Sequence, residues 1–242
     1  MGVKEAVRTK LLSIYKEHGL NVAIQVGYEV LGKMHRTSIE LSEEREKYIK
    51  TNMNGEISET VLEIILMEYM KLHPEQTKEW HISKGLILRD PTKRNSRFMT
   101  ELDLTLFTPK CVYVYECKSY AGEKRIIGKG EIIRLNGNSC DAFRQNAIHV
   151  TTLHNNIKTY SSKPLYQMRL FDFSRGSAQD DREQKYKDLL PYVTVGNVLN
   201  GFSTGEDVWY MPALLKAVKS IEAASERLRP IHLRYVKELH NK

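Results

Sequence analysis

Two short apolar runs that each contain charged residues constrain the possible fold of this chain most strongly. They occupy residues 101–120, Glu-Leu-Asp-Leu-Thr-Leu-Phe-Thr-Pro-Lys-Cys-Val-Tyr-Val-Tyr-Glu-Cys-Lys-Ser-Tyr, with a turn at Pro109 between them. Two β-rich runs on either side of a turn predict a β-hairpin. Positions i and i+2 of a strand share a face, so Glu116 and Lys118 are expected to point to the same side. If Asp103 on the neighbouring strand also faces that way, two carboxylates and one ammonium converge.

The charged residues of this predicted hairpin have a chemical and a structural interpretation. Charged groups in an apolar strand are costly unless they are paired or hold a metal. Two carboxylates and a backbone carbonyl form an oxygen site suited to Mg²⁺, which can polarise a phosphoryl oxygen and lower the pKa of a bound water. A nearby lysine can orient that water or stabilise the growing negative charge. The alternative is an ordinary strand whose Glu–Lys pair is solvated at a sheet edge.

The spacing of these residues carries a family resemblance. Asp103, followed thirteen positions later by Glu116-Cys117-Lys118, resembles the core of the PD-(D/E)XK nuclease superfamily and, more narrowly, the nuclease-related domain (NERD) family. The resemblance covers about residues 50–160, with weaker support from about 189 to 221. Leu102 stands where the superfamily name has a proline, which leaves the carboxylate in place. The family resemblance implies an α/β fold. The expected core is restriction-endonuclease-like, with helices flanking a mixed central β-sheet, and an N-terminal helical extension precedes it.

The resemblance also implies a function, that of a metal-dependent nuclease that hydrolyses phosphodiester bonds. Asp103 and Glu116 would hold Mg²⁺ with help from the Cys117 carbonyl, and Mn²⁺ is expected to substitute. Lys118 would position or activate the attacking water. Gln145, near the start of a later helix, would orient a ligand. We expect the substrate to be DNA, cut to leave a 5′-phosphate and a 3′-hydroxyl.

A set of glutamates precedes the hairpin on a predicted helix. Gly55 is expected to end the preceding segment, and Glu56 to open a helix that reaches Leu72. Glu56, Glu59 and Glu63 lie at spacings of three and four and can share one face. In the family an acidic residue on this first helix faces the metal site, and Glu56 is the better match, with Glu59 as the second candidate in the outer shell. The alternative is that these acids stabilise the N-terminal end of the helix.

Charge favours a polyanionic partner. The formal net charge is +7, and a basic loop leads into the Asp103 strand, with one acid, Asp90, among its cations. Its candidate nucleic-acid-binding residues are Arg89, Lys93, Arg94 and Arg97. They would contact phosphates, or they would form only a solvated loop. We expect nucleic acid, and DNA in particular, as the partner. A homodimer stays open because cutting a duplex needs two sites or two visits.

Several features point away from other classes of protein. No stretch approaches the roughly 18 apolar residues of a membrane span, and no apolar signal core begins the chain, so we expect a cytoplasmic protein without membrane contact. The three cysteines form no CxxC pair and predict neither a zinc site nor a disulfide framework. Besides a nuclease, the chain could be a non-catalytic nucleic-acid-binding module that keeps the fold. A structural or partner-binding component would need an exposed apolar face that the sequence does not locate.

The remaining patterns suggest three parts: residues 1–50 as a mainly helical extension, 51–225 as the nuclease-like domain and 226–242 as a basic tail. Helices are expected over 3–19, 38–52, 141–157 and 211–221, whereas 21–31 fits a strand or a helix. Strands are expected over 80–88, 125–128, 131–135, 164–173 and 189–198. His149 and His154, five residues apart on one predicted helix, are interpreted as incidental.

Overall fold

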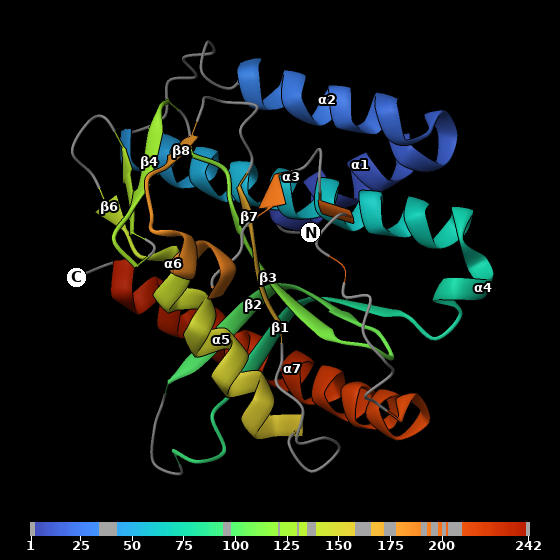
Figure 1. The fold of residues 1–242 in the computed structure, drawn as a ribbon. Coiled ribbons are helices and arrows are strands. Elements are labelled where there is room, and N and C mark those ends of the chain that lie inside the picture. The colour runs from blue at the N-terminus through green and yellow to red at the C-terminus, as the bar shows by residue number, and fades with distance from the viewer. Residues whose placement is uncertain are drawn as a thin grey trace.

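Helices cover both faces of a mixed central sheet (Figure 1). The computed structural model describes residues 3–33, 43–93, 98–120, 122–129, 131–134, 139–157, 166–171, 178–189, 193–194, 198–199, 202 and 210–240. The sheet has the order β1 (His81–Arg89), β2 (Met99–Phe107), β3 (Val112–Lys118), β7 (Tyr166–Phe171) and β9 (Val193–Thr194). The first three strands pair antiparallel, and β3, β7 and β9 pair parallel. The expected α/β architecture and the expected hairpin are therefore confirmed.

A second, smaller sheet lies beside the central one (Figure 1). Its order is β6 (Ser139–Cys140), β5 (Glu131–Arg134), β4 (Lys124–Ile127) and β8 (Ala178–Asp180). The antiparallel pairing of β4 with β5 confirms the short β pair expected after the central hairpin. The short helix α4 (Pro74–Thr77) precedes β1, and the short helix α6 (Gln184–Leu189) lies between β8 and β9.

The alternation of residues along β3 divides the core between two groups of helices. On one side α1 (Val3–His18), α2 (Leu20–Lys33) and α3 (Glu43–Leu72) pack on Tyr113 and Tyr115. On the other side α5 (Ala142–Ile157) and α7 (Met211–His240) pack on Val112 and Val114. Burial of these apolar faces supplies the main favourable term in folding. Residues 21–31, for which strand and helix were both open, belong to a helix.

Helix α3 corrects the prediction that Gly55 separates two segments and that Glu56 opens a helix. The helix is 30 residues long and passes through Gly55. One interior glycine costs a helix only about 1 kcal/mol relative to alanine, and burial of Ile57 and Val61 outweighs that cost. Glu56 and Glu59 therefore lie in the helix interior, where the charge at a helix N-terminus does not explain them. Of the exposed helix expected over 38–52, residues 43–52 belong to α3 and 38–42 lie outside the described residues.

Helix α7 also extends beyond its prediction. It was expected to end near Ile221, with a basic tail from residue 226, but it continues to His240 and includes Pro230. Contacts with β1 hold its second half: the Ile87 amide donates to Ser225 Oγ at 2.8 Å, and Arg229 Nη2 donates to the Gly85 carbonyl at 3.1 Å. Of the strand expected over 189–198, residues 193–194 form β9 and Leu189 ends α6, whereas 190–192 and 195–197 lie outside the described residues.

A kink in β1 and β2 positions the site described below. Gly85 has φ +62°, a conformation that L side chains rarely adopt. Pairing between β1 and β2 continues on both sides but omits Gly85 and Asp103. Ile82 and Leu86 are four positions apart and would share a face in a regular strand. Across Gly85, however, they face opposite sides: Ile82 packs on the α3 side and Leu86 packs on the α7 side. The sheet is therefore open at Asp103. None of the helices in the described part of the chain combines the length and apolar character needed to cross a membrane.

Candidate active site

Asp103, Glu116 and Lys118 converge where β2 and β3 separate. The last backbone pair of the two strands is Leu104 with Tyr115. Beyond it, the Cys117 amide donates to Asp103 Oδ2 at 2.8 Å, so the carboxylate takes the place of a strand partner. Glu116 is fully buried, and its Oε1 forms an ion pair with Lys118 Nζ. The spacing of residues 116 and 118 placed both side chains on one strand face, as expected.

Helix α5 supplies the next contacts. Its start is capped by Asp141, whose Oδ1 accepts the Arg144 amide at 2.8 Å, and its position on β3 is fixed by Asn146 Nδ2, which donates to the Val114 carbonyl at 3.0 Å. This places Gln145 beside the strand, where its Oε1 accepts from Lys118 Nζ at 3.1 Å. The amide oxygen and the Glu116 carboxylate together hold the ammonium in one place.

His149 also belongs to this site, although the sequence interpretation treated it as incidental. Its Nδ1 lies 2.9 Å from Glu116 Oε2, and the residue is 2% exposed. The signal in the sequence was its distance of four residues from Gln145, because residues at i and i+4 share a helix face. His154 does not share that face.

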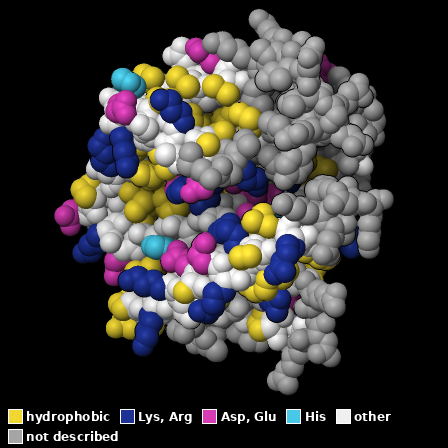
Figure 2. Space-filling model, turned by 180° about the vertical axis from the view of Figure 1, so that it is seen from behind, with side chains coloured by type: hydrophobic (Ala, Val, Ile, Leu, Met, Phe, Trp, Pro, Cys, Tyr) yellow, Lys and Arg dark blue, Asp and Glu magenta, His cyan; other side chains and the backbone are white. Residues whose placement is uncertain are grey.

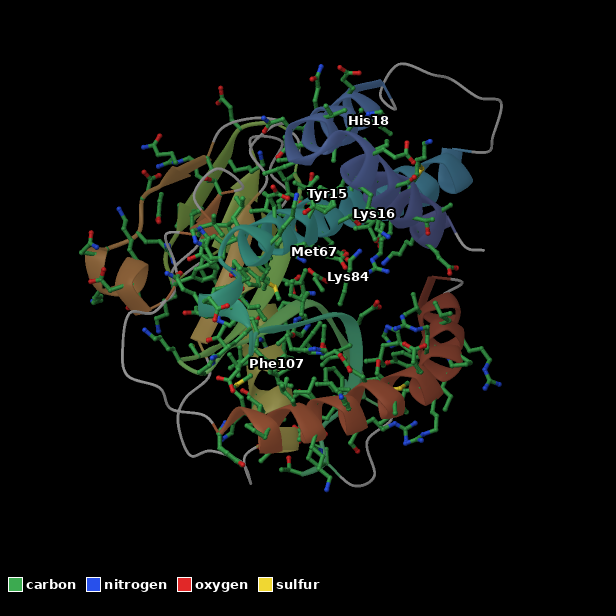
Figure 3. The ribbon with its side chains drawn as sticks, turned by 90° about the vertical axis from the view of Figure 1, so that its right-hand side faces the viewer. Tyr15, Lys16, His18, Met67, Lys84 and Phe107 are labelled. Atoms are coloured by element: carbon green, nitrogen blue, oxygen red, sulfur yellow. The ribbon has the colours of Figure 1, made fainter. Side chains whose placement is uncertain are left out.

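Acidic residues of α3 approach from the other side of the sheet. Glu59 lines a cavity of about 540 Å³ together with Asp103, Gln145 and His149. Glu56 forms an ion pair with Lys84 of β1 and accepts a hydrogen bond from Thr60. Lys84 lies between α3 and α7 in Figure 3. Glu59 is therefore the helix acid that shares a cavity with Asp103, whereas Glu56 is buried against Lys84.

The site holds its carboxylates in unequal states of ionisation. Burial, and then repulsion from Glu116, raises the pKa of Asp103 to about 7. Burial followed by repulsion from Asp103 raises the pKa of Glu59 well above its usual value. Burial opposes ionisation of Glu116 too, but the contact with His149 and the charge of Lys118 outweigh it and lower the pKa of Glu116.

Lys118 is a firmly protonated cation in this arrangement. Burial lowers the pKa of its ammonium, but attraction to Glu116 and Asp103 is stronger, and the pKa is raised. Lys118 therefore carries its charge at neutral pH and can orient a water or stabilise negative charge, rather than take up a proton.

The donor set suits a hard cation. Within the described residues, no group of three or more His, Cys, Asp or Glu side chains is arranged to hold a metal ion. Mg²⁺ does not require such a group, because it is usually held by one or two carboxylates, with water and phosphate oxygens completing its shell. Asp103 and Glu116 provide two carboxylates, and burial together with repulsion from Glu116 raises the pKa of Asp103 even though the Lys118 ammonium attracts it. Cys111, Cys117 and Cys140, which all belong to the described residues, form no disulfide.

Two of the four cations predicted in the basic loop, Arg89 and Lys93, belong to the described residues. Arg89 is exposed at the end of β1, and Lys93 Nζ lies 3.8 Å from Asp90 Oδ2. Neither is among the described residues that line the cavity of Asp103, and Arg94 and Arg97 lie outside the described residues. Among the described residues, the Lys and Arg side chains that line it are Lys4 and Arg144, which sequence reasoning did not select.

Comparison with known proteins agrees with this geometry. Residues 58–171 match the model of the nuclease-related domain family. This stretch is a nuclease-related domain. It contains Glu59, Asp103, Glu116, Lys118 and Gln145, so all three residues of the central cluster lie within it. Neither the curated proteins nor the solved structures yielded a match to this chain. Helices α1, α2 and α7 lie outside the matched nuclease-related domain.

Proposed function

We propose that this chain is a metal-dependent nuclease that hydrolyses phosphodiester bonds in DNA. The observation that carries the proposal is the convergence of Asp103, Glu116 and Lys118 at the point where β2 and β3 separate, within the nuclease-related domain. An ordinary solvated Glu–Lys pair does not account for this arrangement, because Glu116 is fully buried and contacts Lys118 and His149. Burying such charges is costly, and proteins retain them mainly where they are paired or functional.

Asp103, Glu116 and the Cys117 carbonyl would hold Mg²⁺, with Mn²⁺ as a substitute. When bound, the ion would polarise the scissile phosphoryl group and lower the pKa of the attacking water. A cation here would also relieve the repulsion between Asp103 and its neighbouring carboxylates, which is why the residues present fit such an ion.

The protein's own groups would orient the reactants. The Lys118 ammonium, held by Glu116 and Gln145, would direct the water and stabilise the charge that develops on the phosphoryl oxygens. His149 would hold the orientation of the Glu116 carboxylate. Glu59 would add a second acidic group on the α3 side of Asp103, whereas Glu56 would act through its pair with Lys84.

The test is cleavage of plasmid and of single-stranded DNA by the full chain in Mg²⁺, Mn²⁺ or EDTA. The wild type is expected to cut in either metal and not in EDTA, and the Asp103→Ala variant is expected not to cut. Failure of the wild type to cut in any metal, with DNA binding intact, would contradict the proposal and favour the non-catalytic binding module. Equal cutting by the wild type and Asp103→Ala would show that the site is placed wrongly.

A further inference from the structure

The carboxylates that line the cavity of the proposed active site would repel a phosphate group. Four carboxylates line it: Glu59, Glu101, Asp103 and Asp141. A nucleic acid carries a negative charge at every phosphate, and proteins neutralise these charges with Lys and Arg. Approach to this cavity therefore depends on its cations, and among the described residues its lining Lys and Arg side chains are Lys4 and Arg144.

The other lysines of the site are already engaged. Lys118 is held by Glu116 and Gln145, and Lys84 is held by Glu56, with Glu59 Oε2 at 3.7 Å. Lys4 differs from them, since none of the described carboxylates lies within ion-pair distance of its ammonium. Burial lowers the pKa of Lys4, but longer-range attraction to Glu59, Glu101 and other carboxylates outweighs it and raises the pKa. Lys4 therefore keeps its charge near Asp103, with no ion-pair partner among the described carboxylates.

Helix α1 is docked firmly enough to hold Lys4 at this position. Arg8 Nε donates to Glu63 Oε2 at 2.9 Å, and Arg8 Nη2 donates to Glu63 Oε1 at 2.5 Å. About two helical turns further along α1, the Tyr15 hydroxyl donates to Glu68 Oε2 at 2.6 Å. These contacts join α1 to α3. Lys4 itself lies in the first turn of α1, where a positive charge opposes the helix dipole, so the helix gains no stability from it.

Lys4 also connects two cavities. A second cavity, of about 520 Å³, lies between α1, α3 and α7, and Lys4, Glu59 and Glu101 line both. Arg229 of α7 lines the second cavity. Acidic and basic side chains gather around a hollow on the face that Figure 2 shows. The cavity that contains Asp103 is therefore bordered by helix α1, which lies outside the matched nuclease-related domain.

We propose that the Lys4 ammonium binds a backbone phosphate of the nucleic-acid substrate next to the scissile bond, so that the N-terminal helix completes the site. This inference rests on the proposed function and extends it: α1 would bind the substrate together with the nuclease-related domain. It assigns a role in substrate binding to the helical extension. It also places one phosphate contact at a residue that the family match does not cover.

The test is the salt dependence of binding to a fluorescein-labelled DNA oligonucleotide, measured by fluorescence anisotropy with the full chain in Ca²⁺. Lys4→Met keeps a long side chain and a good helix former, and Lys4→Arg keeps the charge. Lys10→Met, an exposed position on the same helix that lines neither cavity, is the matched control. Melting temperatures of all variants establish that they fold.

Removal of one phosphate contact is expected to reduce the slope of log affinity against log salt by about 0.7–0.9. Lys4→Met should show this reduction and a several-fold loss of affinity, whereas Lys4→Arg and Lys10→Met should keep the wild-type slope. An unchanged slope for Lys4→Met, or the same reduction for Lys10→Met, would overturn the inference while leaving the proposed function intact. Absence of binding by the wild type would overturn both.

Discussion

Replacing Asp103 with asparagine should stabilise the metal-free protein while it removes activity. Burial and repulsion from Glu116 raise the pKa of Asp103 from 3.8 to about 7. Since a tenfold change in proton affinity corresponds to about 1.4 kcal/mol, ionising this group in the folded protein costs up to about 4 kcal/mol at pH 8. Asparagine carries no charge and can still accept the Cys117 amide through its side-chain oxygen.

The sign of the pH dependence follows from the direction of this shift. The folded protein holds a proton on Asp103 that the unfolded chain releases above pH 3.8, so this group makes stability fall as pH rises from about 4 to about 7. Below that range the wild type and Asp103→Asn should be similar. Above it the variant should be more stable, and the gap at pH 8 should exceed the gap at pH 5 by about 3 kcal/mol.

The assay is thermal unfolding in EDTA at pH 5 and pH 8. For a chain of this length, 1 kcal/mol corresponds to a shift of about 2–4 °C, so Asp103→Asn is expected to melt up to about 8–16 °C above the wild type at pH 8. Asp141→Asn is the matched control: it removes a carboxylate from the same cavity, but one that is exposed and caps α5. It should be neutral or slightly destabilising. A variant at Asp103 that melts at or below the wild type at pH 8 would refute the electrostatic reasoning.

Three further predictions concern the metal, the helix α5 and the kink in β1. Mg²⁺ should raise the melting temperature of the wild type over that in EDTA, because it binds only the folded site, and it should leave Asp103→Asn unchanged; an equal rise in both would contradict the proposed ligands. His149→Ala should weaken Mn²⁺ binding about 10–100-fold in a calorimetric titration, since the contact with Glu116 is lost, whereas His154→Ala should bind as the wild type does; equal affinities for all three proteins would rule out this role. Gly85→Ala should lower the free energy of unfolding in urea by roughly 1–2 kcal/mol, because φ there is +62°, and should reduce cleavage by displacing Asp103; wild-type values for both would show that the kink is not required.

Local spacing accounts for what the sequence revealed about the site. Glu116 and Lys118 share a face because strand residues alternate, and Pro109 lies in the turn that brings Asp103 back beside them. Gln145 entered the predicted site through the family resemblance and not through local spacing, since its contact with Lys118 joins residues 27 positions apart. The order of elements was likewise sufficient for the mixed sheet with helices on both faces.

The missed features depend on contacts that local spacing does not encode. Gly55 looks like a helix boundary, but packing of the neighbouring residues carries α3 through it. The change of face at Gly85 has no periodic signal, because it arises from one residue with a positive φ. Lys4 lies about 100 residues before Asp103, and only the docking of α1 on α3 reveals that both line one cavity.

The most direct test of the account compares Lys118→Ala with Lys110→Ala, a lysine exposed in the turn of the same hairpin. Cleavage of plasmid DNA in Mg²⁺ and binding of the same DNA in Ca²⁺ would be measured for both variants and the wild type. Loss of the Lys118 charge should lower the cleavage rate by at least about 100-fold, the effect of removing one group that stabilises transition-state charge, with DNA affinity unchanged within a few-fold. Lys110→Ala should cleave as the wild type does. Wild-type cleavage by Lys118→Ala would contradict the assignment of the active site.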